Sequence, residues 1–364
     1  MPHIVIDARI INSSTGTYVE RLLHYLQKID KINNYTILIP TADQTFWQPT
    51  NQKWSVKFCD IANYSLSEQT KMKRFLEDLK PDLVHFCMPQ QPLFYRGKKV
   101  TTFHDLTLLR VYNSDKNYLI FKTKQLIGRF LFKRFVRDNQ AIITPTQYTK
   151  NDLVQFAKIN PDKVFVTYES ADIGIYKLEK YQLPFEKFIL NIGRHSDYKN
   201  NVRLAEAHQR LIKKYPNLGL IFVNKLDEAT KNNQKIFRER GYKNIHFTGA
   251  ISKGARDYIY KKATVYATPS LFEGFGLTGL EAMGFGVPVV SSNATCLPEV
   301  YGDAALFCNP TSVEDIAAKI EQILSSEKLR RDLIKRGLAR HQTFSWGKMA
   351  RETLAVYQKV LNDN

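Results

Sequence analysis

The sequence is poor in cysteine and lacks the arrangements of cysteine that bind metals. Its four cysteines show no C-x-x-C spacing and have no histidine at ligand spacing; they are Cys59, Cys87, Cys296 and Cys308. Acidic pairs of the form D-x-D are also missing, although such carboxylates are common ligands of divalent cations. We therefore expect reduced thiols, as in a cytosolic protein, and no metal cofactor.

Long apolar runs are missing as well. No stretch of about 18 apolar residues occurs. The chain opens directly on a predicted strand, 3–7, without a basic and then apolar leader. These absences predict a cytoplasmic protein that is either soluble or peripheral on the inner face of the cell membrane.

Acidic residues are scarce relative to basic ones. The 364 residues include 53 Lys and Arg but only 35 Asp and Glu, which gives a net charge of +18. Such a field attracts nucleotides, anionic lipids or nucleic acid, and its sign alone does not choose among them. The hydrophobic fraction of 43% is that of an ordinary globular protein, and the length suits two domains.

Short apolar segments alternate with helical patterns along both halves of the chain, which indicates an α/β protein with parallel, doubly wound sheets. The predicted strands are 4–8, 35–39, 83–86, 99–103, 141–145 and 164–168, then 188–192, 219–223, 245–248, 265–267, 287–291 and 305–307. The irregular segment 172–185 reads as the linker. We predict two Rossmann-like domains, 1–172 and 173–364, that face each other across a ligand-binding cleft.

The first predicted loop, 12–17, contains a single glycine, Gly16. Because this loop has no G-x-G-x-x-G pattern, a dinucleotide-dependent oxidoreductase is not predicted. Gly16 remains a candidate contact of a ligand phosphate, although a loop with one glycine is less suited to phosphate binding than a loop with several.

The stretch 270–300 contains the most informative pattern. Glu273 is followed by Gly274, Phe275 and Gly276, and a predicted helix begins at Leu277. A glycine-rich loop before a helix presents unpaired amides and the positive end of the helix dipole, which suits a phosphate. Glu281, one turn into the helix, could accept hydrogen bonds from a ribose diol. The alternative is a structural loop whose helix merely carries a glutamate in its first turns.

A second loop, 191–200, lies between a predicted strand and a predicted helix. Gly193 frees the backbone, Arg194 offers a planar set of donors and Lys199 offers a point charge, which together suit a diphosphate. The alternative is an exposed loop with two solvated cations.

These motifs resemble family 4 of the retaining GT-B glycosyltransferases. The resemblance rests on E-G-F-G-L-x-x-L-E-A-M with a later L-P-E-V, and on G-R-x(4)-K-N. It implies that Glu281 holds the donor ribose and that Glu273 faces the transferred sugar. It also implies that the amides from Gly276 to Thr278 meet the diphosphate together with Arg194 and Lys199. Thr278 stands where the family usually has proline.

Three further assignments follow from the resemblance. His104, in the sequence T-x-H-D-L, would approach the transferred sugar, with Glu273 as the second catalytic residue. The donor base would lie near Gly249 to Ile251, contacted mainly by backbone. The last helix, about 345–362, would pack on the N-terminal domain.

We therefore predict retaining transfer of a hexose, such as mannose, from a nucleoside-diphosphate sugar to a saccharide or lipid-linked acceptor. The rival mechanism is a double displacement with Glu273 as the nucleophile. A sugar-nucleotide epimerase would use the same residues without an acceptor. A basic nucleic-acid binder is a further alternative, but no basic and aromatic platform appears.

The stretch 116–137 carries seven Lys and Arg, no acid and interleaved apolar residues. Lys122, Arg129 and Lys133 share one stripe of the predicted helix. Part of this helix must pack against the sheet, and its basic edge could face an anionic membrane surface.

Overall fold

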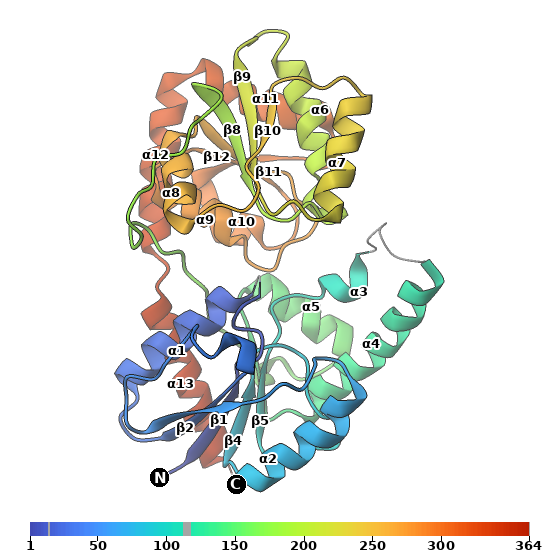
Figure 1. Ribbon diagram of the computed structural model, residues 1–364, viewed down its shortest axis with the longest axis vertical. Helices are drawn as coiled ribbons and strands as arrows, with labels where there is room; N and C mark the ends of the chain where they lie inside the picture. Colours follow the sequence, from blue (N-terminus) through green and yellow to red (C-terminus); the bar gives the residue numbers. More distant parts are fainter. Residues whose placement is uncertain (14, 112–117, 364) are drawn as a thin grey trace. The chain divides into compact units, whose positions relative to one another are not determined.

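The computed structural model describes residues 1–13, 15–111 and 118–363, so Lys116 and Asn117 of the basic stretch lie outside the described residues. The chain forms two compact units (Figure 1). The first unit comprises Met1–Leu109, Lys122–Glu169 and Ser345–Asn364, and the second comprises Arg110–Phe121 and Ser170–Phe344.

The first unit is built on a parallel seven-stranded sheet in the order β3-β2-β1-β4-β5-β6-β7. Its strands are β1 (His3–Asp7), β2 (Asn34–Ile39), β3 (Trp54–Phe58), β4 (Leu83–Phe86), β5 (Lys99–Thr102), β6 (Ala141–Thr144) and β7 (Val164–Val166). Every residue of β4, β5 and β6 is buried, as expected for parallel strands covered on both faces.

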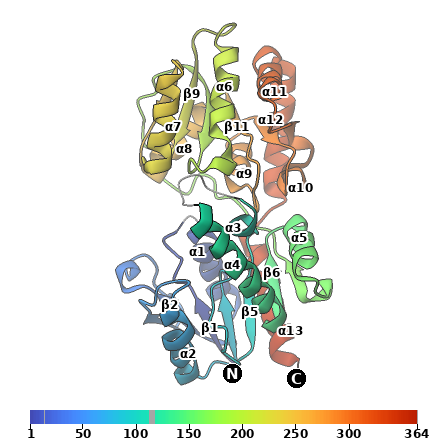
Figure 2. The ribbon, with the colours of Figure 1, turned by 90° about the vertical axis from the view of Figure 1, so that its right-hand side faces the viewer.

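Helices cover both faces of this sheet, as Figures 1 and 2 show. They are α1 (Gly16–Ile29), α2 (Lys73–Leu79), α3 (Thr107–Arg110), α4 (Tyr118–Asp138) and α5 (Gln147–Ala157), with a π-helical turn at Glu68–Met72 and short 3-10 turns at Thr41–Asp43 and Pro161–Lys163. The apolar faces of α4 and α5 pack on β6 through Phe132, Leu153 and Ile142. These contacts remove apolar surface from water, which is the main stabilising contribution to such a layer.

The last helix, α13 (Trp346–Asn362), belongs to the first unit. It packs against α1, β4 and β6. Its Tyr357 hydroxyl lies 2.5 Å from Nδ1 of His85 in β4. The chain therefore returns to its first sheet after completing the second.

The second unit has a parallel six-stranded sheet in the order β10-β9-β8-β11-β12-β13. Its strands are β8 (Lys187–Ile192), β9 (Leu218–Val223), β10 (Ile245–Phe247), β11 (Val265–Thr268), β12 (Val289–Ser292) and β13 (Ala305–Cys308). Its helices are α6 (Asn201–Leu211), α7 (Glu228–Glu239), α8 (Lys253–Lys262), α9 (Leu277–Gly284), α10 (Leu297–Tyr301), α11 (Val313–Ser325) and α12 (Glu327–Gln342), with 3-10 turns at Asp197–Lys199 and Gly302–Ala304.

The strand order of the second sheet reverses between β8 and β11, because β9 and β10 lie on one side of β8 and β12 and β13 lie beyond β11. Loops that leave the carboxyl ends of two such strands diverge and leave room for a ligand. The loop after β8 carries Lys199, and the loop after β11 carries Glu273. The topology thus brings together the two motifs that the sequence singled out.

Candidate active site

Lys199 and Glu273 form an ion pair in the second unit. The Lys199 ammonium donates to both carboxylate oxygens of Glu273, at 2.7 and 2.8 Å. Burial opposes the charge of Lys199, but Glu273 outweighs this effect and raises the pKa of Lys199 above its usual value. The lysine is therefore a permanent cation at neutral pH.

Contacts of His195 and Asn200 fix the loop that carries Lys199. The buried ring of His195 lies against Phe222 and accepts a hydrogen bond from the Asn233 amide at 2.9 Å. The side-chain amide of Asn200 donates to the carbonyls of Pro269 and Pro310. Asn200 adopts a left-handed conformation with φ of +62°, which asparagine tolerates better than most residues. Lys199 is consequently held in place by its neighbours.

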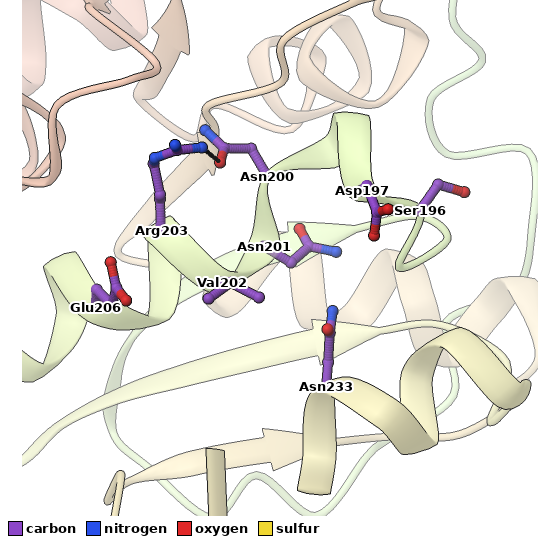
Figure 3. Close-up of a pocket in the computed structure, with 8 residues that line it drawn as sticks. All are labelled: Ser196, Asp197, Asn200, Asn201, Val202, Arg203, Glu206 and Asn233. Carbon is purple, nitrogen blue, oxygen red and sulfur yellow. Dashed lines mark hydrogen bonds between the residues drawn. The ribbon is translucent and has the colours of Figure 1, made fainter. Parts of the chain in front are cut away.

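A cavity of about 320 Å³ adjoins this loop (Figure 3). It is lined by Ser196, Asp197, Asn200, Asn201, Val202, Arg203, Glu206 and Asn233. Within the figure, Arg203 donates to the Asn200 side-chain oxygen at 2.9 Å. The lining includes neither Lys199 nor Glu273, so the cavity borders the ion pair's loop without containing the pair.

The N-terminus of α9 presents amides without a side-chain cap. Gly276 is its N-cap residue, with φ of +90°, and supplies no side-chain oxygen. By contrast, Asp227, Ser252 and Ser312 cap α7, α8 and α11 with their side chains. The first amides of a helix have no intrahelical acceptor, so this terminus is suited to an anion.

Two glycines at this terminus are required by the packing of Tyr301. The Tyr301 hydroxyl donates to the Gly276 carbonyl at 2.6 Å. A Cβ atom on Gly276 or Gly279 would approach that hydroxyl oxygen to 2.5 or 2.2 Å. Because Gly276 also has a positive φ, any other residue there would be strained.

Glu281 lies in α9 with both carboxylate oxygens engaged. The Tyr260 hydroxyl donates to one oxygen at 2.8 Å, and the Arg256 guanidinium lies 3.4 Å from the other. Burial raises the pKa of Glu281, while Arg256 and Tyr260 act in the opposite direction. Both partners come from α8, and the sequence analysis missed them because nothing in KGARDYIYKK separates them from an ordinary basic helix.

Two other predicted residues of this unit, Arg194 and Phe275, differ in their exposure to solvent. Arg194 follows Gly193, its side chain is 71% exposed, and its Nε lies 3.6 Å from Asp227. Phe275 is buried and packs edge-on against Phe344.

The loop between β10 and α8 contains Gly249, with φ of +69°, and Ile251. Leu277 and Thr278 begin α9, and the Thr278 hydroxyl accepts from the Tyr266 hydroxyl at 2.7 Å. The structure therefore joins Lys199 to Glu273 and shows no contact of Arg194 with either.

The predicted residues of the first unit are already engaged within it. His104 follows β5, with Nδ1 at 3.2 Å from the Glu169 carboxylate and Nε2 at 3.0 Å from the Cys87 carbonyl. Gly16 begins α1, and its amide donates to the Ser13 carbonyl. A Cβ at Gly16 would lie 1.8 Å from a backbone oxygen, so packing alone requires glycine there.

The described part of the chain contains no group of three or more His, Cys, Asp or Glu side chains placed to bind a metal ion. Among the same residues, the structure contains no helix with the length and apolar character that a membrane crossing requires. Among the described residues, the four cysteines are buried thiols and form no disulfide.

The fold and these motifs belong to a glycosyltransferase. Residues 178–340 match the family model for glycosyl transferases group 1, and residues 15–173 match that for glycosyltransferase family 4. The two models together span most of the chain. The protein thus belongs to the family 4 glycosyltransferases, enzymes with the GT-B fold.

Several curated relatives are mannosyltransferases. The chain is 29% identical to O-antigen chain mannosyltransferase B of Escherichia coli, over 82% of this chain and 80% of that protein. It is 28% identical to the serotype-specific mannosyltransferase WbdA of Escherichia coli, over 98% of this chain but only 47% of that protein. The chain therefore spans about half the length of WbdA.

Among solved structures, HepE of Anabaena, crystallised in complex with UDP and glucose, superposes with a TM-score of 0.74. The two proteins are 16% identical, and the match covers 99% of this chain and 100% of HepE. At this identity the likeness supports the GT-B fold.

Proposed function

We propose that this glycosyltransferase transfers a hexose, mannose in the first instance, from a nucleoside-diphosphate sugar to an acceptor hydroxyl with retention of the anomeric configuration. The observation that carries the proposal is the convergence of Lys199, Glu273 and the uncapped amides of α9 at one edge of the second sheet. The names of the curated relatives support mannose, and HepE bound to UDP supports a nucleotide donor.

In this proposal the diphosphate binds between Lys199 and the first amides of α9. Negative charge develops on the diphosphate as the sugar leaves, and a fixed ammonium together with fixed amide dipoles stabilises it. Glu281 accepts from the two ribose hydroxyls, and Tyr260 and Arg256 hold its carboxylate in position. Gly249 and Ile251 contact the base through their backbone.

Arg194 reaches the diphosphate when a donor is bound. Its exposed side chain is 3.6 Å from Asp227, and such an exposed pair costs little to break. Gly193, with φ of +139° and open space around it, gives the backbone freedom at this point. Gly274, Phe275 and Gly276 supply the loop that approaches the phosphates, with Leu277 and Thr278 continuing it.

The position of Glu273 favours front-face attack over a double displacement. In a double displacement, a Glu273 oxygen would attack the anomeric carbon and form a covalent intermediate. Both Glu273 oxygens accept from Lys199, which lowers their nucleophilicity. In front-face attack, the leaving phosphate oxygen takes the proton of the acceptor hydroxyl, while Glu273 and His104 orient the transferred sugar.

Metal independence is part of the proposal. Lys199, Arg194 and the α9 amides supply the positive charge that a metal would otherwise bring to the diphosphate. Activity in EDTA equal to that without it supports this part. Complete loss that manganese or magnesium restores would contradict it.

A panel of sugar nucleotides tests the donor. The matching donor at about 100 times its dissociation constant should add about 2.7 kcal/mol to the free energy of unfolding. The anomeric coupling in the product's NMR spectrum then distinguishes retention from inversion. Conversion of the donor into an epimer without transfer would favour the epimerase alternative, and salt-dependent RNA retention without donor binding would favour a nucleic-acid binder.

For the acceptor, we propose a saccharide, either free or linked to a lipid. The name of the O-antigen relative supports a growing polysaccharide. A lipid-linked acceptor requires the enzyme to act as a peripheral protein at the cytoplasmic face of a membrane.

A further inference from the structure

The middle turns of α4 expose large apolar side chains. Leu126, Ile127 and Phe130 are 69%, 55% and 65% exposed. Leu126 and Phe130 are four residues apart, so they lie on one helix face, one turn from each other. Neighbouring apolar side chains that are this exposed are uncommon on the surface of a soluble monomer.

The opposite face of α4 holds the helix to the first unit. The Gln125 amide donates to the Leu109 carbonyl at 3.0 Å, and a Cβ on Gly128 would contact the Leu109 side chain at 3.2 Å. Further along, Phe132, Phe135 and Val136 are buried in the core. The position of Leu126 and Phe130 on the outside is therefore fixed, because the inner face is occupied.

Cations surround the exposed apolar residues. Lys122, Lys124, Arg129, Arg134 and Arg137 are exposed. From 121 to 138 the only acid is Asp138, at the far end of the helix, where it pairs with Arg134 at 2.7 Å. The face thus combines an apolar centre with a positively charged border.

Two of the basic side chains pack on a ring of the neighbouring helix α5. Arg129 and Lys133 lie over the ring of Phe156 in α5, at 5.6 and 5.4 Å from its centroid. Reversing their charge would disturb the contact between α4 and α5. We therefore leave Arg129 and Lys133 unchanged and test the charge of this surface at the exposed Lys122 and Lys124.

We propose that the outer face of α4 lies in the interface of an anionic lipid bilayer, with Leu126, Ile127 and Phe130 inserted among the acyl chains. An in-plane amphipathic helix with cations beside its apolar face binds anionic lipid in this way. The cations attract anionic headgroups while the apolar side chains leave water. This inference rests on the proposed function for its purpose, since it would hold the enzyme beside a lipid-linked acceptor.

Co-sedimentation of the full chain with vesicles, in the absence of donor, tests the inference. We expect binding to vesicles of phosphatidylglycerol and phosphatidylcholine at low salt, release at high salt, and little binding to phosphatidylcholine alone. Leu126→Gln with Phe130→Gln should lower the partition coefficient at least about tenfold. Lys122→Gln with Lys124→Gln should lower it by roughly fivefold for each cation.

Matched control variants show whether any loss of vesicle binding is specific to the outer face of α4 or follows from removing an exposed apolar or basic residue anywhere on the protein. Ile32→Gln removes a 62% exposed apolar residue of the same unit, and Lys328→Gln with Lys335→Gln removes two exposed lysines of α12. Both should bind vesicles as the unsubstituted chain does. Unchanged circular dichroism and melting temperature must accompany each variant.

Several results would overturn the inference: no pelleting with anionic vesicles, equal loss in the controls, or α4 variants that bind normally. A dimer that Leu126→Gln with Phe130→Gln dissociates, without vesicle binding, would assign the face to a second copy of the chain. Transfer to a water-soluble acceptor should be unaffected by the α4 variants. Failure of vesicle binding with transfer intact therefore rejects only the membrane surface.

Discussion

Lys199 and Arg194 carry the same charge in different surroundings, and this difference predicts different consequences of their removal. Either substitution to Ala should weaken the binding of both donor and free nucleoside diphosphate by roughly 1.5–3 kcal/mol, because each loses a charge-assisted contact. Lys199→Ala should also lower the free energy of unfolding by about 1–3 kcal/mol, since Glu273 loses its partner. Arg194→Ala should leave stability within about 0.5 kcal/mol. Calorimetric titration and chemical unfolding measure both quantities, and unchanged nucleotide binding in both variants would reject the phosphate site.

His104 is anchored within the first unit, and the nucleotide-binding residues proposed above lie in the second. His104→Ala should therefore reduce kcat with little effect on the dissociation constant of the nucleoside diphosphate. Glu169→Ala should reduce kcat in the same direction but less, because His104 keeps its contact with the Cys87 carbonyl. Steady-state kinetics and nucleotide titration of the same preparations measure kcat and the dissociation constant and so test this prediction. Weakened nucleotide binding with unchanged kcat would place His104 in a different role.

Residue types predicted part of this site. Glu273, Glu281, Arg194 and Lys199 lie in motifs whose spacing implies their chemistry. Arg256 and Glu169 could not be found in this way, because each acquires its partner only when separate elements pack together. The local sequence shows which functional groups are present, but the packing of separate elements determines which of these side chains contact one another.

At the scale of the element, the N-terminus of α9 depends on the space that its glycines leave for Tyr301. Gly276→Ala should lower the free energy of unfolding by about 1–3 kcal/mol from backbone strain alone, with an added cost from the contact with Tyr301. Nucleotide binding should weaken as the first amides shift.

Gly286→Ala is the matched control, because Gly286 also has a positive φ, of +73°, but its Cβ would meet only Ile334 at 3.7 Å. Differential scanning calorimetry of the two variants isolates the cost of the clash. Equal melting temperatures would show that Tyr301 simply moves aside.

Strong apolar patterns predicted most strands, but the strand β3 and several helices, α5 among them, were missed. β3 went unrecognised because Trp54 is its only buried residue, as befits the edge of the sheet. The helix α5 was missed because Thr144–Leu153 reads as polar, and its N-cap bond from the Thr149 amide to Thr146 is not visible as an apolar period. The sequence also predicts a helix over 66–79, and the structure has a π-helical turn within it, at Glu68–Met72, which a regular period does not reveal.

At the scale of the whole molecule, buried histidines predict a loss of stability in mild acid. Burial lowers the pKa of His85 to about 3 and that of His195 and His208 to about 4. Since these values lie below about 6.5, the value of an unfolded chain, the unfolded state binds more protons and stability falls as pH drops from about 6.5 toward 4. Each histidine contributes a loss of about 2 kcal/mol between pH 7 and pH 5.

Urea unfolding at the two pH values measures this loss, and His208→Gln should reduce it by about 2 kcal/mol. Glu68, Glu281 and Glu352 act with the opposite sign, because burial raises the pKa of each carboxyl, so the comparison of His208→Gln with the unsubstituted chain isolates the contribution of one histidine. An unchanged pH dependence in His208→Gln would show that the pKa of His208 is the same in the folded and unfolded states.

The return of α13 to the first unit has a consequence during synthesis. The segment from Ser170 to Phe344, which holds all six strands of the second sheet, is made before Ser345–Asn364. Domains tend to fold in the order in which they leave the ribosome, but here the first sheet must wait for its last helix. On a translating ribosome, the second unit therefore has its full set of strands while the face of the first sheet that α13 covers is still open.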